Sequence, residues 1–198
     1  MNDTNEILSV DERSKGSTTV FGFWLYLMTD LVLFASLFAV FAVLRGPAFG
    51  GASMGNMFSL PYVLVETIVL LSSSFACGIA LLCARAGSIR GALAWLSATF
   101  VLGAIFVGME VSEFSSLIAQ GDGPSKNGFL SSYFTLVGTH GTHVAIGLLW
   151  LLILIVAMLQ RGLTHGNMRK LALFAMFWHF LEIVWIFIFT IVYLTGSL

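Results

Sequence analysis

The sequence contains few charged residues. Only 10% of its 198 residues are charged and 58% are hydrophobic, whereas a soluble domain carries roughly a quarter charged residues. Nine Lys and Arg against ten Asp and Glu leave a formal charge of -1, and no basic run is longer than Arg169-Lys170. This composition excludes a soluble globular domain, and the lack of a basic surface excludes a nucleic-acid partner.

Cysteine and the common cofactor motifs are also scarce. The only two cysteines, Cys77 and Cys83, lie six residues apart in one apolar run. On a helix this spacing gives about 9 Å of axial rise, which is too far for a disulfide. We interpret both as packing residues. The sequence has no C-x-x-C, no haem-attachment C-x-x-C-H and no glycine-rich nucleotide loop, so the signatures of soluble cofactor enzymes are missing.

Long apolar runs dominate the chain. Five of them approach or exceed the ~20 residues that a membrane-spanning helix needs, and they cover about 20–44, 61–84, 92–112, 129–159 and 171–194. The connections between them are too short for a separate domain. We predict an all-α integral membrane protein: a five-transmembrane-helix bundle at 20–198, after a polar tail at 1–19 that lacks the features of a signal peptide.

The basic residues predict how the bundle is oriented. Five spans place the two termini on opposite faces of the membrane. One face collects Arg13, Lys15, Arg85, Arg90, Arg161, Arg169 and Lys170, whereas the other has only Arg45 and Lys126. Since basic residues concentrate on the cytoplasmic side, the N-terminus is predicted to be cytoplasmic and the C-terminus periplasmic.

Eight acidic or histidine side chains fall within or beside the spans, where an ionisable residue is a functional candidate by default. Counting the helical rise from the cytoplasmic span ends sorts them into two levels. A buried polar inner tier, roughly 12–17 Å deep, contains Asp30, His179 and Glu182. An outer tier, roughly 25–31 Å deep, contains Glu66, Glu110, Glu113, His140 and His143.

Two pairs among these eight residues have the spacing of metal or haem ligands. His140 and His143 share one helical face, as do His179 and Glu182. However, the two pairs are offset by about 13 Å along the membrane normal, whereas metal ligands converge to about 2 Å from one ion. The same offset opposes bis-histidine haem ligation by His143 and His179. We therefore predict no catalytic, cofactor-binding or metal-binding residue in this chain.

Hydrogen bonds between helices are the simpler interpretation of these residues. In the inner tier, His179 is expected to bond toward Asp30 or Glu182. In the outer tier, His140 and His143 are expected to bond toward Glu66 or Glu110. We expect a structural role for both tiers, with a further role of the inner tier toward protons or lipids.

From these features three functional classes remain open. They are an accessory subunit of a larger complex, a small proton-coupled transporter and a haem-binding membrane anchor. A proton relay would have to cross the membrane, and the ~10 Å between the tiers leaves a gap in it.

Several segments together carry a family pattern. They are FGFWLYLMTD (21–30), LPYVLVET (60–67), GMEVSEF (108–114), GFLSSYFTLVGTHGTHV (128–144) and FWHFLEIVW (177–185). In this order the segments resemble subunit III of haem-copper respiratory oxidases. Among these the chain is most similar to the five-helix form found in cytochrome bo-type ubiquinol oxidases, from about residue 21 to residue 198. The family histidines correspond to His140, His143 and His179, and Asp30 stands where relatives bury a carboxylate.

The resemblance implies a subunit that has no redox centre and belongs to a proton-pumping terminal oxidase, which reduces oxygen to water. Haem and copper would lie in subunit I, ubiquinol would be the substrate of the complex, and the partners would be subunits I, II and IV with membrane phospholipids. This chain would contribute stability, lipid binding and a supply of protons or oxygen. The implied location is the bacterial inner membrane.

The sequence departs from the family pattern at one position and leaves the electron donor open. Glu182 stands where the WHF motif is usually followed, one residue on, by Asp, so the acid is kept and its reach is longer by one methylene. Most cytochrome c oxidase relatives have seven helices in this subunit, but some bacterial ones have five. Subunit III of a cytochrome c oxidase is therefore the alternative.

Overall fold

The computed structural model describes residues 2–46 and 60–194, with side chains described from residue 18 to 46 and from 61 to 194. These residues form helices and no strand. The five α-helices are α1 (Asn2–Leu44), α2 (Leu60–Arg85), α3 (Ile89–Ala119), α4 (Gly128–Arg161) and α5 (His165–Ile188), and a π-helical segment, Phe189–Leu194, continues α5. All five are long and apolar enough to cross a membrane. The predicted five-helix membrane bundle is confirmed.

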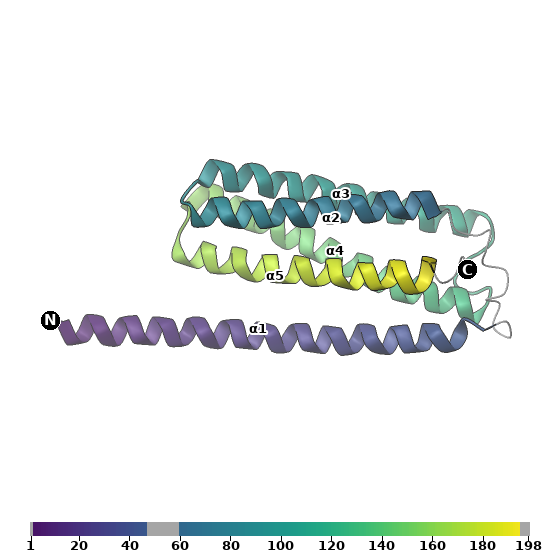
Figure 1. The fold of residues 1–198 in the computed structure, drawn as a ribbon, viewed down its shortest axis with the longest axis horizontal. Helices are drawn as coiled ribbons and strands as arrows, with labels where there is room; N and C mark the ends of the chain where they lie inside the picture. Colours follow the sequence, from purple (N-terminus) through teal and green to yellow (C-terminus); the bar gives the residue numbers. More distant parts are fainter. Residues whose placement is uncertain (1, 47–59, 195–198) are drawn as a thin grey trace.

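The helices run alternately up and down the long axis of the bundle (Figure 1). The helices α2, α3, α4 and α5 form a closed set in which α2 and α4 each pack against both α3 and α5. The first helix lies outside this set and packs against α4 and α5. It begins at one end of the bundle and α5 ends at the other (Figure 1), as an odd number of spans requires.

The helices extend beyond the predicted apolar runs. The backbone is helical from Asn2 onward, so the predicted tail at 1–19 continues the first spanning helix. No proline interrupts residues 2–44, and extending a helix costs less than starting one. The third helix continues past the predicted end at residue 112 to Ala119. Hydropathy locates the part of a helix that lies in lipid, and a helix can continue through polar sequence.

The turns between helices are set by capping residues that hydropathy does not register. Ser88, Asn127 and Thr164 each cap a helix by accepting a backbone N–H three residues on, which satisfies a donor that the helix leaves free. Gly162 ends α4 with a positive φ of 68°, a conformation that glycine adopts without strain. The turns at 86–88 and 162–164 are therefore shorter than the predicted connections at 85–91 and 160–170.

Trp178 of α5 fills the centre of the closed four-helix set. Its indole nitrogen donates to the Ser73 hydroxyl at 3.2 Å. A methyl group at Gly103 or Gly147 would come within about 3 Å of the Trp178 ring, so these two glycines provide the space that the ring occupies. About two turns later on α5, Trp185 donates to the Thr67 hydroxyl at 3.1 Å. Two tryptophans of α5 thus fix its register against α2.

Candidate functional site

The first polar cluster joins α2 to α5. The Ser74 hydroxyl lies 2.6 Å from Nδ1 of His179 and donates to the carboxylate of Glu182. The same histidine nitrogen is 3.5 Å from Oε2 of Glu182. The predicted proximity of His179 and Glu182 is therefore seen, and we call these three residues the His179 cluster.

Asp30 of α1 lies beside a different histidine. Its Oδ2 is 3.8 Å from Nε2 of His143 on α4, and Tyr26 interacts with its carboxyl one turn earlier on α1. No hydrogen bond or ion pair joins Asp30 to His179 or Glu182 in the described part of the chain. Of the two partners expected for His179, the structure shows Glu182 and not Asp30. Asp30, predicted in the inner tier, instead pairs with His143, which was predicted in the outer tier.

The tier assignment of Asp30 fails for a geometric reason. The depth estimate counted from the ends of the apolar runs, and these ends do not lie level with one another. The fourth helix has 34 residues, whereas the span of the first, Thr18–Leu44, has 27. Asp30 and His143 each lie near the middle of their own span, which brings them to one depth.

The contact of His143 with Thr139 determines which of its ring nitrogens carries a proton. Its Nδ1 is 2.8 Å from the carbonyl oxygen of Thr139. Since a carbonyl only accepts, Nδ1 must carry a proton, and Nε2 of the neutral ring is then an acceptor. This acceptor faces the carboxyl of Asp30. A bond between the two groups requires one further proton, held by the carboxyl or by the ring.

A second polar cluster contains three glutamates near the end of the bundle where α1 ends. Glu66 of α2 and Glu110 of α3 are buried, and each interacts electrostatically with Glu113. The Tyr193 hydroxyl donates to Glu113 at 3.4 Å and lies 2.8 Å from the hydroxyl of Tyr133. We call Glu66, Glu110 and Glu113 the glutamate cluster.

Gly141 makes room for one member of this cluster. A methyl group on Gly141 would overlap the carboxylate of Glu110, with 2.6 Å to its Cδ. Within the described residues, Oε1 of Glu110 and both carboxyl oxygens of Glu66 have no hydrogen-bond partner. The predicted bonds from His140 and His143 to these glutamates are therefore absent.

His140 is held by aromatic rings instead. It is completely buried, stacks on Trp185 with 5.2 Å between ring centroids and meets the edge of Phe106 at 6.0 Å. Neither of its ring nitrogens has a hydrogen-bond partner among the described residues. His140 therefore occupies the aromatic core between α3, α4 and α5, beside the glutamate cluster.

Sequence reasoning missed several residues that complete these clusters. Ser74 was not among the predicted site residues, yet it is the partner of both His179 and Glu182. Tyr26 approaches the carboxyl of Asp30 from one turn earlier on α1. Tyr193 approaches the carboxyl of Glu113 from the segment that follows α5. The spacing of Thr67 and Ser74, seven residues apart on α2, marks the face toward α5 and was the available signal.

No metal-binding geometry is found in the part of the chain that the structure describes. The described residues include no group of three or more His, Cys, Asp or Glu side chains able to hold a metal ion. Cys77 and Cys83 are free thiols. Of the three histidines predicted within the spans, His143 faces Asp30, His179 contacts Ser74 through its Nδ1, and His140 is enclosed by aromatic rings.

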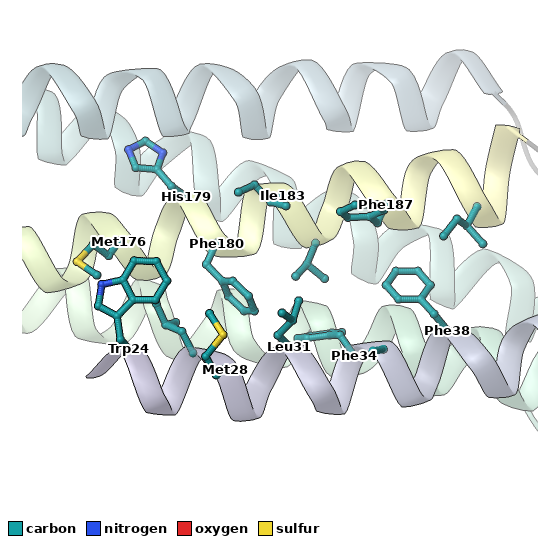
Figure 2. A pocket seen from close by; sticks show the side chains of 14 residues that line it. Trp24, Met28, Leu31, Phe34, Phe38, Met176, His179, Phe180, Ile183 and Phe187 are labelled. Atoms are coloured by element: carbon teal, nitrogen blue, oxygen red, sulfur yellow. The ribbon is translucent and has the colours of Figure 1, made fainter. Parts of the chain in front are cut away.

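An apolar groove separates α1 from α5 (Figure 2). Its volume is about 600 Å³. Trp24, Met28 and Leu31 contribute one wall from α1, and Phe180 and Phe187 contribute to the facing wall from α5. His179 lies at its margin, and its ring rises from α5 on the side away from α1 (Figure 2). The groove has the dimensions and chemistry of a site for a hydrocarbon chain.

Fold and site together define a multi-pass membrane protein whose ionisable residues contact one another and the helices around them. A family profile described as cytochrome c oxidase subunit III matches residues 12–197. The chain belongs to this family of haem-copper oxidase subunits.

Curated relatives agree over nearly the whole chain. The cytochrome bo(3) ubiquinol oxidase subunit 3 of Pseudomonas aeruginosa is 58% identical over 183 residues, covering 92% of this chain and 88% of the relative. The quinol oxidase subunit 3 of Bacillus subtilis is 44% identical over 181 residues, with coverages of 91% and 89%. The cytochrome bo(3) ubiquinol oxidase subunit 3 of Buchnera aphidicola is 39% identical over 194 residues, with coverages of 98% and 95%.

Proposed function

We propose that this chain is the non-catalytic subunit III of a proton-pumping cytochrome bo-type ubiquinol oxidase. The observation that carries the proposal is its 58% identity, over 92% of its length, to a relative named as that subunit. In this assembly haem and copper reside in subunit I, which also performs the quinol chemistry. Subunits I, II and IV are the protein partners.

The contacts of His143 and His179 support the placement of the redox centres in another subunit. A haem held by this chain would need two histidines on facing helices, with their free nitrogens directed at one space. Here His143 and His179 contact residues of two different helices, α1 and α2. We therefore assign the redox centres to a partner subunit.

The proposed location is the bacterial inner membrane, with the N-terminus in the cytoplasm and the C-terminus in the periplasm. The imbalance of basic residues supports this orientation: seven lie on the face of the N-terminus and two on the other. The helix order supports the placement of the two termini on opposite faces.

Within the complex, the chain contributes stability and binds membrane phospholipids. The groove between α1 and α5 supports lipid binding because it is apolar and large enough for an acyl chain. The polar residues predicted in the two tiers are assigned a structural role, since Asp30, His143, His179, Glu182 and Glu113 lie at contacts between helices. The inner tier was predicted to be buried, but the side chain of His179 is 46% exposed. Asp30 and His143 together can hold a proton, which supports a role in the supply of protons to the oxidase.

The electron donor separates this proposal from its alternative, a cytochrome c oxidase subunit III. The test is to tag this chain, purify the complex in mild detergent and measure oxygen consumption with ubiquinol or reduced cytochrome c as the donor. We expect turnover with ubiquinol. Turnover with cytochrome c alone would establish the alternative, and an absence of co-purifying haem would contradict both.

A further inference from the structure

The His179 cluster occupies the middle of the membrane. His179 lies midway along the span His165–Leu194, and Ser74 lies midway along Pro61–Arg85. The three side chains therefore hold their polar atoms at the depth where the bilayer is least able to solvate them. Their position cannot be attributed to the interfacial region near a helix end.

This cluster is partly exposed on the outside of the bundle. The side chain of His179 is 46% exposed and that of Glu182 is 17% exposed. Among the described residues, His179 is the only histidine, acidic or basic side chain that is exposed more than two turns from a helix end. Ionisable residues at this depth usually face the interior of a bundle or a water-filled cavity.

The hydrogen bonds within the cluster determine what could bind it. Ser74 has one proton and donates it to Glu182, so its oxygen accepts from Nδ1 of His179 at 2.6 Å. In the neutral ring, Nε2 is then an acceptor. Nε2 has no partner among the residues that the structure describes. A matching group must therefore donate a hydrogen bond, and it would face a cluster that contains a carboxylate.

The surroundings of the cluster suit a helix as the partner. Gly78 lies one turn after Ser74 on α2, and a methyl group there would meet no atom within 4 Å. Small residues at such positions let a second helix approach closely. The cluster is flanked by Phe75, which is 70% exposed, and by Ile186. A small polar centre with an apolar margin is typical of contacts between transmembrane helices.

We propose that a transmembrane helix of another subunit of the same oxidase covers the surface of α2 and α5 centred on the His179 cluster and donates a hydrogen bond to Nε2 of His179. The inference rests on the proposed function, because it requires a multisubunit complex. It adds the docking surface and the chemistry of the contact. The groove between α1 and α5 opens on the other flank of α5 and is left to lipid.

Site-specific photo-crosslinking in the intact complex tests the surface. Phe75→p-benzoylphenylalanine places the probe beside Ser74. Val101→p-benzoylphenylalanine is the control, because Val101 is exposed near the middle of α3, the helix diagonally opposite α5. We expect a protein adduct between this chain and another oxidase subunit from position 75, and only lipid adducts from position 101. A protein adduct from position 101 alone, or from neither position, would overturn the proposal.

A substitution tests the hydrogen bond itself. His179→Leu removes the acceptor, and we expect the ratio of bound to released chain in detergent to fall about threefold, the size expected for one interhelical hydrogen bond in a membrane. His165→Leu is the matched control at the exposed start of α5. Equal retention of the His179→Leu and wild-type chains would contradict the bond. If the wild-type chain fails to co-purify with haem-containing subunits, the proposed function itself is wrong.

Discussion

Gly141 has no side chain, and this leaves the space that the carboxylate of Glu110 occupies. Glu110 is buried, and its carboxylate occupies the space where a Cβ on Gly141 would lie. The glycine belongs to the segment GTHGTHV and lies between His140 and His143. The motif therefore includes a residue whose role is to admit a glutamate from the neighbouring helix.

Gly141→Ala is expected to destabilise the subunit, because the new methyl group and the Glu110 carboxylate cannot both fit. Overpacking of this kind costs ~1–3 kcal/mol. The measurement is the midpoint of thermal unfolding of this chain in the purified complex. Gly108→Ala is the control, since a Cβ at Gly108 meets no atom within 4 Å. A double variant with Glu110→Ala should recover part of the loss, and an unchanged midpoint in Gly141→Ala would contradict the account.

Asp30→Asn addresses the proton that Asp30 and His143 can share. The carboxamide keeps the volume and can donate to Nε2 of His143, but it cannot bind or release a proton. We expect the oxidase to lose activity faster during continuous turnover while its haem content stays unchanged. Oxygen consumption followed over successive turnovers measures this decay, with Asp122→Asn in the loop between α3 and α4 as the control. Identical decay in the Asp30→Asn and wild-type enzymes would remove the proton role.

At the scale of the elements, the groove between α1 and α5 exists because α1 packs against only part of the bundle. It contacts α4 and α5, and Trp24, Met28 and Leu31 line the groove on its side. Long side chains on facing helices hold the backbones apart, and in a membrane such a gap fills with hydrocarbon. The lipid role proposed for the chain thus depends on the spacing of two helices.

Ala35→Phe should displace lipid from this groove. Ala35 is one of the residues that line it, and a phenyl ring there would fill part of the space for an acyl chain. We expect less phospholipid to be retained per purified complex, as measured by mass spectrometry, with an unchanged haem spectrum. Ala104→Phe is the matched control on the outer face of α3. Equal lipid content in the two variants would contradict a lipid site in the groove.

The elements also show what the sequence could and could not predict. The five spans followed from hydropathy, because each helix needs a long apolar run to cross the bilayer. Helix ends did not follow, because they depend on caps such as Asn127 and Thr164 and on the continuation of helices through polar segments. The pairing of Asp30 with His143 was missed because it depends on how far α4 slides along α1, and no single helix encodes that offset.

At the scale of the whole molecule, membership in the cytochrome c oxidase subunit III family was predicted from motifs and is shown by the family profile and the relatives. The site was predicted less completely. Residue types and depth identified the ionisable side chains, but Ser74, Tyr193 and Gly141 became visible only once four helices had been brought together. Contacts between helices are a property of the assembled bundle.

The central claim is that this chain is a subunit without its own redox centre. The most direct test is to tag the chain, purify the complex, separate the chain from the larger subunits and record a reduced-minus-oxidised spectrum of both fractions. The account predicts that the haem and copper remain with the larger subunits and that the separated chain has no haem band. A stoichiometric haem band in the separated chain would contradict it.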